Sequence, residues 1–251
     1  MMSRSISRLA ALTKRNIREI VRDPLSLIFT LALPLFMEVL FYFIFHNLTD
    51  QFQMRYLAPG IVAFSQAFLT LFTGLLIALD RSTSFLTRLF VSETKPFEFI
   101  FSYAVSVLPI TLVQTVLFFL VGGLIDPSLF GPGMLLAIPV SLVTSMFFIG
   151  TGILFGCICN EKSIGGISSI IITGQSVLSG MWFPTAGLGN GILTVMKVLP
   201  FKNATILIQN TVNGITAPWE EFVLPLIIVL GYTVVVFTVA VIAFRGKMRN
   251  I

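Results

Sequence analysis

Six long apolar stretches, separated by short polar breaks, fill most of this 251-residue chain. They lie at 25–46, 57–79, 99–124, 134–158, 164–181 and 221–244. A helix of about 20 apolar residues crosses a bilayer core ~30 Å thick, and lipid tolerates only structures that satisfy their own backbone polar groups. The sequence therefore predicts an all-α, polytopic membrane protein with six transmembrane helices.

The composition excludes a soluble enzyme. Charged residues make up 11% of the chain, whereas a soluble domain has about 25%. The chain has no phosphate-binding glycine loop and no Ser/His/Asp set, and Cys157, Cys159 and His46 do not make a zinc site. We expect no catalytic, cofactor-binding or metal-binding residues. The basic residues lie in the breaks beside the membrane, so we expect no nucleic-acid partner.

The distribution of basic residues predicts the orientation. If the N-terminus is cytoplasmic, the segments 1–24, 80–98, 159–163 and 245–251 are also cytoplasmic and hold 13 of the 16 Lys and Arg residues. This bias follows the positive-inside rule. We therefore predict a multi-pass protein of the cell (inner or plasma) membrane with both termini in the cytoplasm. Tyr56, Trp182 and Trp219 then fall near the outer interface.

Residues 3–22 have the pattern of a basic amphipathic helix. One face carries five arginines, and apolar residues such as Ile6, Ile17 and Ile20 occupy the opposite face. Such a helix lies in the membrane interface, in contact with lipid. It is either a simple anchor or an elbow that also contacts a cytoplasmic partner. The five arginines are Arg4, Arg8, Arg15, Arg18 and Arg22.

The break at 80–98, DRSTSFLTRLFVSETKPFE, predicts a short cytoplasmic helix. Ser82, Thr83 and Ser84 offer an N-cap. Four apolar residues then recur on one helical face: Phe85, Leu86, Leu89 and Phe90. The segment is either a connecting loop or a docking element for a cytoplasmic protein.

The segment 181–220 is broken by glycine and proline, and its apolar runs, 192–199 and 204–208, are too short to span. We expect two short helices that re-enter or lie on the outer leaflet as a lid. Polar residues also occur inside the spans, with Glu38 near the middle of the first and Gln66 and Gln114 in later ones. Each is a candidate for the translocation path or for interhelical packing, and packing is the favoured role for the glutamines.

The order of these features resembles the membrane subunit of a type-2 ATP-binding-cassette (ABC) exporter over essentially the whole chain. The resemblance is strongest at 80–98, with its polar start and Arg88, and at 174–200, GQSVLSGMWFPTAGLGNGILTVMKVLP. The second stretch matches the family at Ser179, Gly180, Phe183, Pro184 and Pro200. It departs where Leu188-Gly189 replaces a frequent Leu-Pro, and where Gln209 and Asn210 replace a frequent arginine.

The resemblance implies one permease domain over 1–251, with an amphipathic helix at 1–24, a coupling region at 80–98 and a broken outer segment at 182–220. Export is then powered by a separate ATPase subunit that holds ATP and Mg, and a second permease copy completes a homodimer or heterodimer. Phe183 and Pro184 belong to the gate. The implied ATPase-coupling residues are Ser82, Thr83, Phe85, Leu86, Arg88, Leu89 and Phe90. The alternatives are an ATP-independent carrier or channel, or a membrane scaffold without transport.

Overall fold

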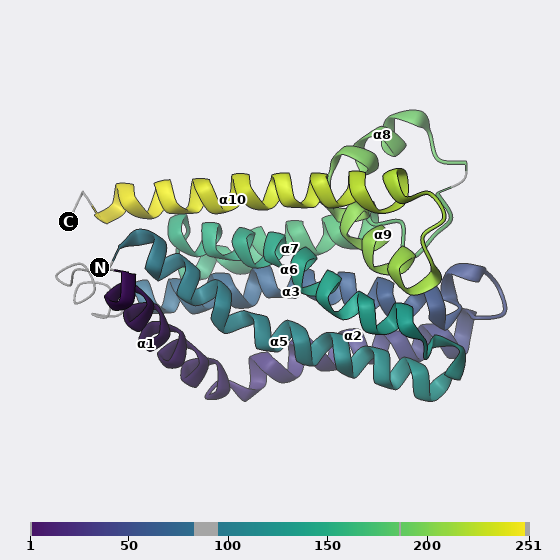
Figure 1. The fold of residues 1–251 in the computed structure, drawn as a ribbon, viewed down its shortest axis with the longest axis horizontal. Coiled ribbons are helices and arrows are strands. Elements are labelled where there is room, and N and C mark those ends of the chain that lie inside the picture. Colours follow the sequence, from purple (N-terminus) through teal and green to yellow (C-terminus); the bar gives the residue numbers. More distant parts are fainter. Residues whose placement is uncertain (1, 83–94, 186, 249–251) are drawn as a thin grey trace.

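The computed structural model describes residues 2–82, 95–185 and 187–248, which are helical with short connections and contain no strand (Figure 1). The long helices are α1 (Met2–Val21), α2 (Pro24–Phe45), α3 (Met54–Ser82), α5 (Pro96–Ile125), α6 (Pro132–Ile158), α7 (Glu161–Leu178) and α10 (Leu224–Met248). Two shorter helices precede α10, namely α8 (Asn190–Val198) and α9 (Pro200–Asn213). Single turns lie at Asp50–Phe52, Pro127–Leu129 and Trp219–Val223.

Within the described residues, four helices are long and apolar enough to cross a membrane: Met54–Ser82, Pro96–Ile125, Pro132–Ile158 and Trp219–Gly246. A fifth span arises if α8 and α9, which meet at a bend of 75°, are counted together. The apolar helix at Thr30–Phe45 is shorter than these. The structure thus supports an all-helical membrane protein with four or five candidate spans, and the count of six stays a prediction.

Proline and a side-chain cap determine where several helices begin. Pro96, Pro132 and Pro200 each occupy the first turn of a helix, where a missing N–H is harmless and the fixed φ suits the helix. The side chain of Asn160 accepts a hydrogen bond of 3.0 Å from the Ser163 N–H and caps α7. As a result, α6 and α7 are joined by a tight turn.

Helix α3 is the central element of the bundle. It packs against α2, α5, α6, α7 and α9. In its most apolar stretch of 18 residues, 78% of the residues are buried. The contact with α6 is a close backbone approach, because a Cβ on Gly152 would lie 2.6 Å from the Thr70 carbonyl oxygen. Small residues at such crossings allow helices to pack tightly in a membrane.

The bundle has two distinct ends (Figure 1). The termini end holds both chain termini, the end of α3, the start of α5 and the turn between α6 and α7. The loop end holds the connections 46–53 and 126–131 together with α8 and α9. This arrangement places the residues on both sides of 83–94 beside the N-terminal helix.

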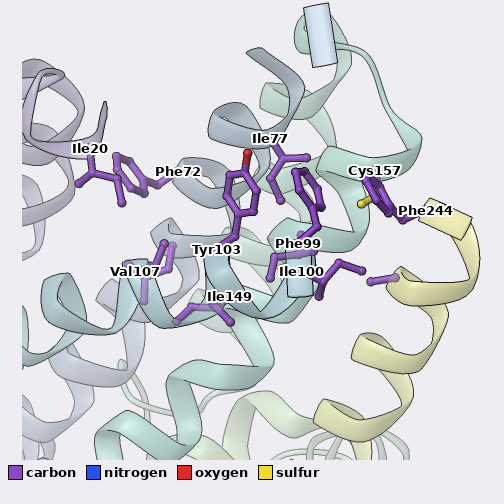
Figure 2. Packing of buried hydrophobic residues seen from close by; sticks show 14 of the residues in the cluster. Ile20, Phe72, Ile77, Phe99, Ile100, Tyr103, Val107, Ile149, Cys157 and Phe244 are labelled. Atoms are coloured by element: carbon purple, nitrogen blue, oxygen red, sulfur yellow. The ribbon is translucent and has the colours of Figure 1, made fainter. Parts of the chain in front are cut away.

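A hydrophobic cluster near the termini end joins α1 and α10 to α5 (Figure 2). Ile20 of α1 is buried in it. The rings of Phe99 and Phe244 stack with centroids 4.3 Å apart. In contrast, Ile6 and Val21 of α1 are exposed. Helix α1 therefore packs on the protein along one side and leaves part of its apolar face uncovered.

Candidate coupling and gating sites

A polar cluster at the termini end joins three helices. Arg15 of α1 donates hydrogen bonds from both Nη atoms to the carboxylate of Asp80, near the end of α3. The hydroxyl of Tyr103, on α5, donates to the same carboxylate. Asp80 is 5% exposed, so this is a nearly buried acid with charged and neutral donors. The helical pattern of residues 3–22 predicts that Arg15 faces lipid or a cytoplasmic partner, whereas in the structure its guanidinium binds Asp80 inside the protein.

Neighbouring contacts extend this cluster along α1 and α5. Glu19 accepts a hydrogen bond from Arg15 one turn away. The side-chain amide of Asn16 donates to Ser102 Oγ at 3.3 Å. At the start of α5, the Glu98 carboxylate accepts from the Lys95 backbone N–H at 3.1 Å. The chain is thus fixed just before and just after residues 83–94.

Burial and neighbouring charge shift the titration of two groups on α1. Burial of the Arg15 guanidinium opposes its charge, but the hydrogen bond and charge of Asp80 outweigh burial and raise the pKa of Arg15. Burial and the negative charge of Asp80 raise the pKa of Glu19, although Arg15 acts in the opposite direction. Arg15 therefore stays a cation, whereas the charged form of Glu19 is disfavoured by its surroundings.

Arg81 links the end of α3 to the end of α6. Its Nη1 donates to the carbonyl oxygens of Gly156 at 2.7 Å and Cys159 at 2.9 Å, which are acceptors left unpaired where a helix ends. A recess of about 390 Å³ lies beside it, between the end of α3 and the α6–α7 turn. Exposed Ser82, whose hydroxyl donates to the Leu79 carbonyl oxygen, borders this recess. The other predicted coupling residues, Thr83, Phe85, Leu86, Arg88, Leu89 and Phe90, lie outside the described residues.

Both ends of the Gln66 side-chain amide are hydrogen-bonded in the interior. Its amide nitrogen donates to the Ser141 carbonyl oxygen at 2.9 Å, and its amide oxygen accepts from Thr144 Oγ1 at 2.9 Å. Both partners are on α6, so the contacts join α3 to α6. Gln114 differs, because its nitrogen reaches the Thr30 carbonyl oxygen at 3.3 Å while its buried oxygen has no partner among the described residues.

Glu38 is a wholly buried carboxyl on α2. A Cβ placed on Gly122 would lie 2.8 Å from Glu38 Oε1 and 3.0 Å from both Leu129 Cδ2 and Met54 Sδ. The carboxyl thus occupies space left by a glycine near the end of α5. Because Met54 begins α3 and Leu129 is in the loop after α5, Glu38 lies toward the loop end. The sequence analysis placed it near the middle of its span.

An aromatic cluster near the loop end surrounds Trp182. The indole lies 4.9 Å from the ring of Phe41, 5.7 Å from Phe64 and 6.5 Å from Phe52, measured between centroids. Its Nε1 donates to Ser176 Oγ at 3.0 Å. We call Phe41, Phe52, Phe64 and Trp182 the aromatic cluster. It connects α2, the turn Asp50–Phe52, α3 and the segment after α7.

The two predicted gate residues, Phe183 and Pro184, directly follow Trp182 of this cluster in the chain. Phe183 is half-buried and Pro184 is exposed, whereas the preceding Met181 is buried. Just after α7, Gly180 has a φ of 72°, a conformation that glycine adopts without strain. Sequence reasoning placed Trp182 at the interface because tryptophan is common there. The sequence did not show that Met181 would be buried and Pro184 exposed.

Side-chain amides hold α8 and α9 in place. Asn203 donates to the carbonyl oxygens of Lys197 and Leu199 at 2.9 and 2.6 Å, across the bend. The side-chain amide of Gln209 donates to the Tyr56 carbonyl oxygen at 2.9 Å. Helix α9 is therefore fastened to the start of α3.

The comparison with protein families agrees with this architecture. The model of the ABC-2 type transporter family matches residues 7–212, which is most of the chain. The chain therefore belongs to this family. It is the membrane permease component of a transporter, a kind of subunit that is generally not itself a catalyst. No curated protein matches the chain.

Proposed function

We propose that this chain is the permease subunit of an ATP-driven exporter, working with a separate ATPase subunit and a second permease copy. The observation that carries the proposal is the cluster of Arg15, Asp80 and Tyr103. It joins α1, α3 and α5 on both sides of 83–94. A displacement of that segment by an ATPase would move three helices together instead of bending one loop.

The proposed coupling surface comprises Ser82, Thr83, Phe85, Leu86, Arg88, Leu89 and Phe90. The polar recess beside Ser82 and Arg81 supports it, because a soluble partner needs a polar surface at the membrane edge. Contact there would be transmitted to α6 through the hydrogen bonds of Arg81.

We further propose six spans, formed by α2, α3, α5, α6, α7 and α10, within one permease domain over 1–251. Helix α1 then lies in the inner interface of the cell membrane, and α8 and α9 re-enter from outside. The shared position of both termini at one end supports this topology (Figure 1). The exposed Ile6 and Val21 support an interfacial α1, because exposed apolar side chains on a basic helix suit lipid.

The proposed path for cargo passes Gln114 and Glu38. The amide oxygen of Gln114 and both carboxyl oxygens of Glu38 lack hydrogen-bond partners among the described residues. Gln66, with both ends of its amide paired, is assigned to packing. The gate at the loop end comprises Trp182 and its aromatic neighbours, with Phe183 and Pro184 beside them.

The testing experiment is purification of the tagged chain in mild detergent, followed by identification of co-purifying proteins. We expect a stoichiometric soluble protein with a phosphate-binding loop, and we expect Arg88→Glu to release it. Arg55→Glu, at an exposed position of the loop end, is the matched control and should retain the partner. Transport by the isolated chain, driven by an ion gradient alone, would instead establish an ATP-independent carrier.

A further inference from the structure

Glu38 differs from the other buried acids of the described chain. Asp80 is bonded to Arg15 and Tyr103, and Glu98 accepts from a backbone N–H. Neither oxygen of Glu38 has a hydrogen-bond partner among the described residues, although its side chain is fully buried. Buried polar groups are almost always paired in folded proteins. A buried acid without a hydrogen-bond partner is one that a positively charged ligand can stabilise.

The surroundings of Glu38 indicate what kind of ligand this is. Met54 and Leu129 converge on the same point as the carboxyl, and both belong to the hydrophobic cluster that contains Phe41 and Trp182. An ion pair is strong in such low-dielectric surroundings. Aromatic faces attract cations as well. The site thus combines one acidic side chain with an extended apolar and aromatic lining.

We propose that Glu38 and the aromatic cluster form a binding site for lipophilic organic cations, which are the cargo class of the exporter. This inference rests on the proposed function. An isolated ionised carboxylate is costly in apolar surroundings, so the closed site holds the neutral acid. When the cation enters, the carboxyl proton leaves to water and the carboxylate pairs with the cation. The charge of the occupied site equals that of the empty one, since one positive charge replaces another.

Two matched substitutions follow from the geometry. Glu38→Gln keeps the shape of the side chain and removes its capacity for negative charge. Gly122→Ala puts a methyl group 2.8 Å from Glu38 Oε1, which displaces the carboxyl. Gly231→Ala is its control, because a Cβ there meets nothing within 4 Å. Glu220→Gln, at an exposed acid of the loop end, controls for surface charge.

The experiment is equilibrium dialysis of the full chain in detergent with tetraphenylphosphonium, a cation with an apolar surface. Trp219→Phe leaves Trp182 as the sole tryptophan of the two in the sequence, so quenching of its fluorescence reports the site. We expect saturable binding, quenching and proton release. We expect Glu38→Gln to weaken affinity at least about tenfold, or about 1.4 kcal/mol, and Gly122→Ala to weaken it too. The anion tetraphenylborate, of the same shape, should not compete.

Equal tetraphenylphosphonium affinity in the parent and Glu38→Gln proteins would overturn the inference, as would competition by tetraphenylborate or the absence of saturable binding. Failure of the proposed function looks different. In that case no ATPase co-purifies, while binding still depends on Glu38. If the ATPase co-purifies and the Glu38→Gln protein binds tetraphenylphosphonium with the parent affinity, only the cation site is refuted.

Discussion

Asp80→Asn is the sharpest test of how the termini end is assembled. The substitution keeps the size of the side chain and one acceptor oxygen, but it removes the charge that pairs with Arg15. It also weakens the acceptor for the Tyr103 hydroxyl. We expect a loss of folding stability and a loosening of α1 from the start of α5.

The size of the loss follows from burial and from the remaining partners. Breaking a fully buried ion pair costs about 3–5 kcal/mol, and a hydrogen bond to a charged group contributes about 1.5–3 kcal/mol. The Arg15 side chain is 27% exposed and keeps its bond to Glu19, which reduces the penalty. We therefore expect about 2 kcal/mol, or about 4–8 °C in Tm for a chain of this size.

The assay uses Cys157, which is buried in the hydrophobic cluster beside this site. With Cys159 changed to serine, a thiol-reactive dye reports unfolding as Cys157 becomes accessible on heating. Asp50→Asn is the control, because Asp50 is exposed at the loop end and should shift Tm little. A double-mutant cycle with Arg15→Gln should give a coupling energy of about 1–2 kcal/mol. An unchanged Tm in Asp80→Asn, or additive effects in the cycle, would refute the reasoning.

Three further predictions concern the same bundle. The pKa of Glu19 is raised by burial and by Asp80, so its stabilising contribution is present below the unfolded pKa of about 4.3 and is lost as pH rises through the folded pKa. Glu19→Gln should therefore flatten the fall of Tm as pH rises above the unfolded pKa, and an unaltered slope would contradict the assignment. Arg81→Met removes two carbonyl contacts. It should lower Tm by about 2–4 °C, from about 1 kcal/mol, and speed labelling of Cys159; labelling at the parent rate would count against the cap. Gln66→Leu should lower Tm while leaving transport per folded molecule unchanged, whereas a transport defect at equal protein level would return Gln66 to the path.

The sequence was most informative where length and hydropathy decide the outcome. Helices were expected at every apolar stretch, and the described helices lie at each of them. The break after 181 was also expected, because glycine and proline stop a helix for local reasons. The number of spans is harder to predict. Helix α9 has buried residues such as Asn203 and Thr205, so its depth depends on packing as well as on composition.

Arg15 shows why the polar cluster at the termini end could not be found from helix periodicity. Its position among five arginines on one face predicts a solvated or lipid-facing side chain, because an isolated helix has no other partner. The actual partner, Asp80, is on α3, 65 residues away in the chain. A signal was present, since Asp80 is an acid at the very end of an apolar stretch. A single sequence does not show which basic residue pairs with Asp80.

Glu38 and Gln66 are both buried polar residues, but only Gln66 has hydrogen-bond partners among the described residues. Each is a polar residue in an apolar helix, and in lipid each is stable only if a neighbouring element compensates it. Helix α6 offers Gln66 a carbonyl oxygen and a hydroxyl. The two ends of the Gln66 amide therefore serve to join α3 to α6. Beside Gly122, the Glu38 carboxyl lies near Leu129 and Met54 and has no hydrogen-bond partner among the described residues. A buried group with unused hydrogen-bonding capacity is the one that a charged ligand can stabilise, which makes Glu38 the residue where cargo selection should be sought.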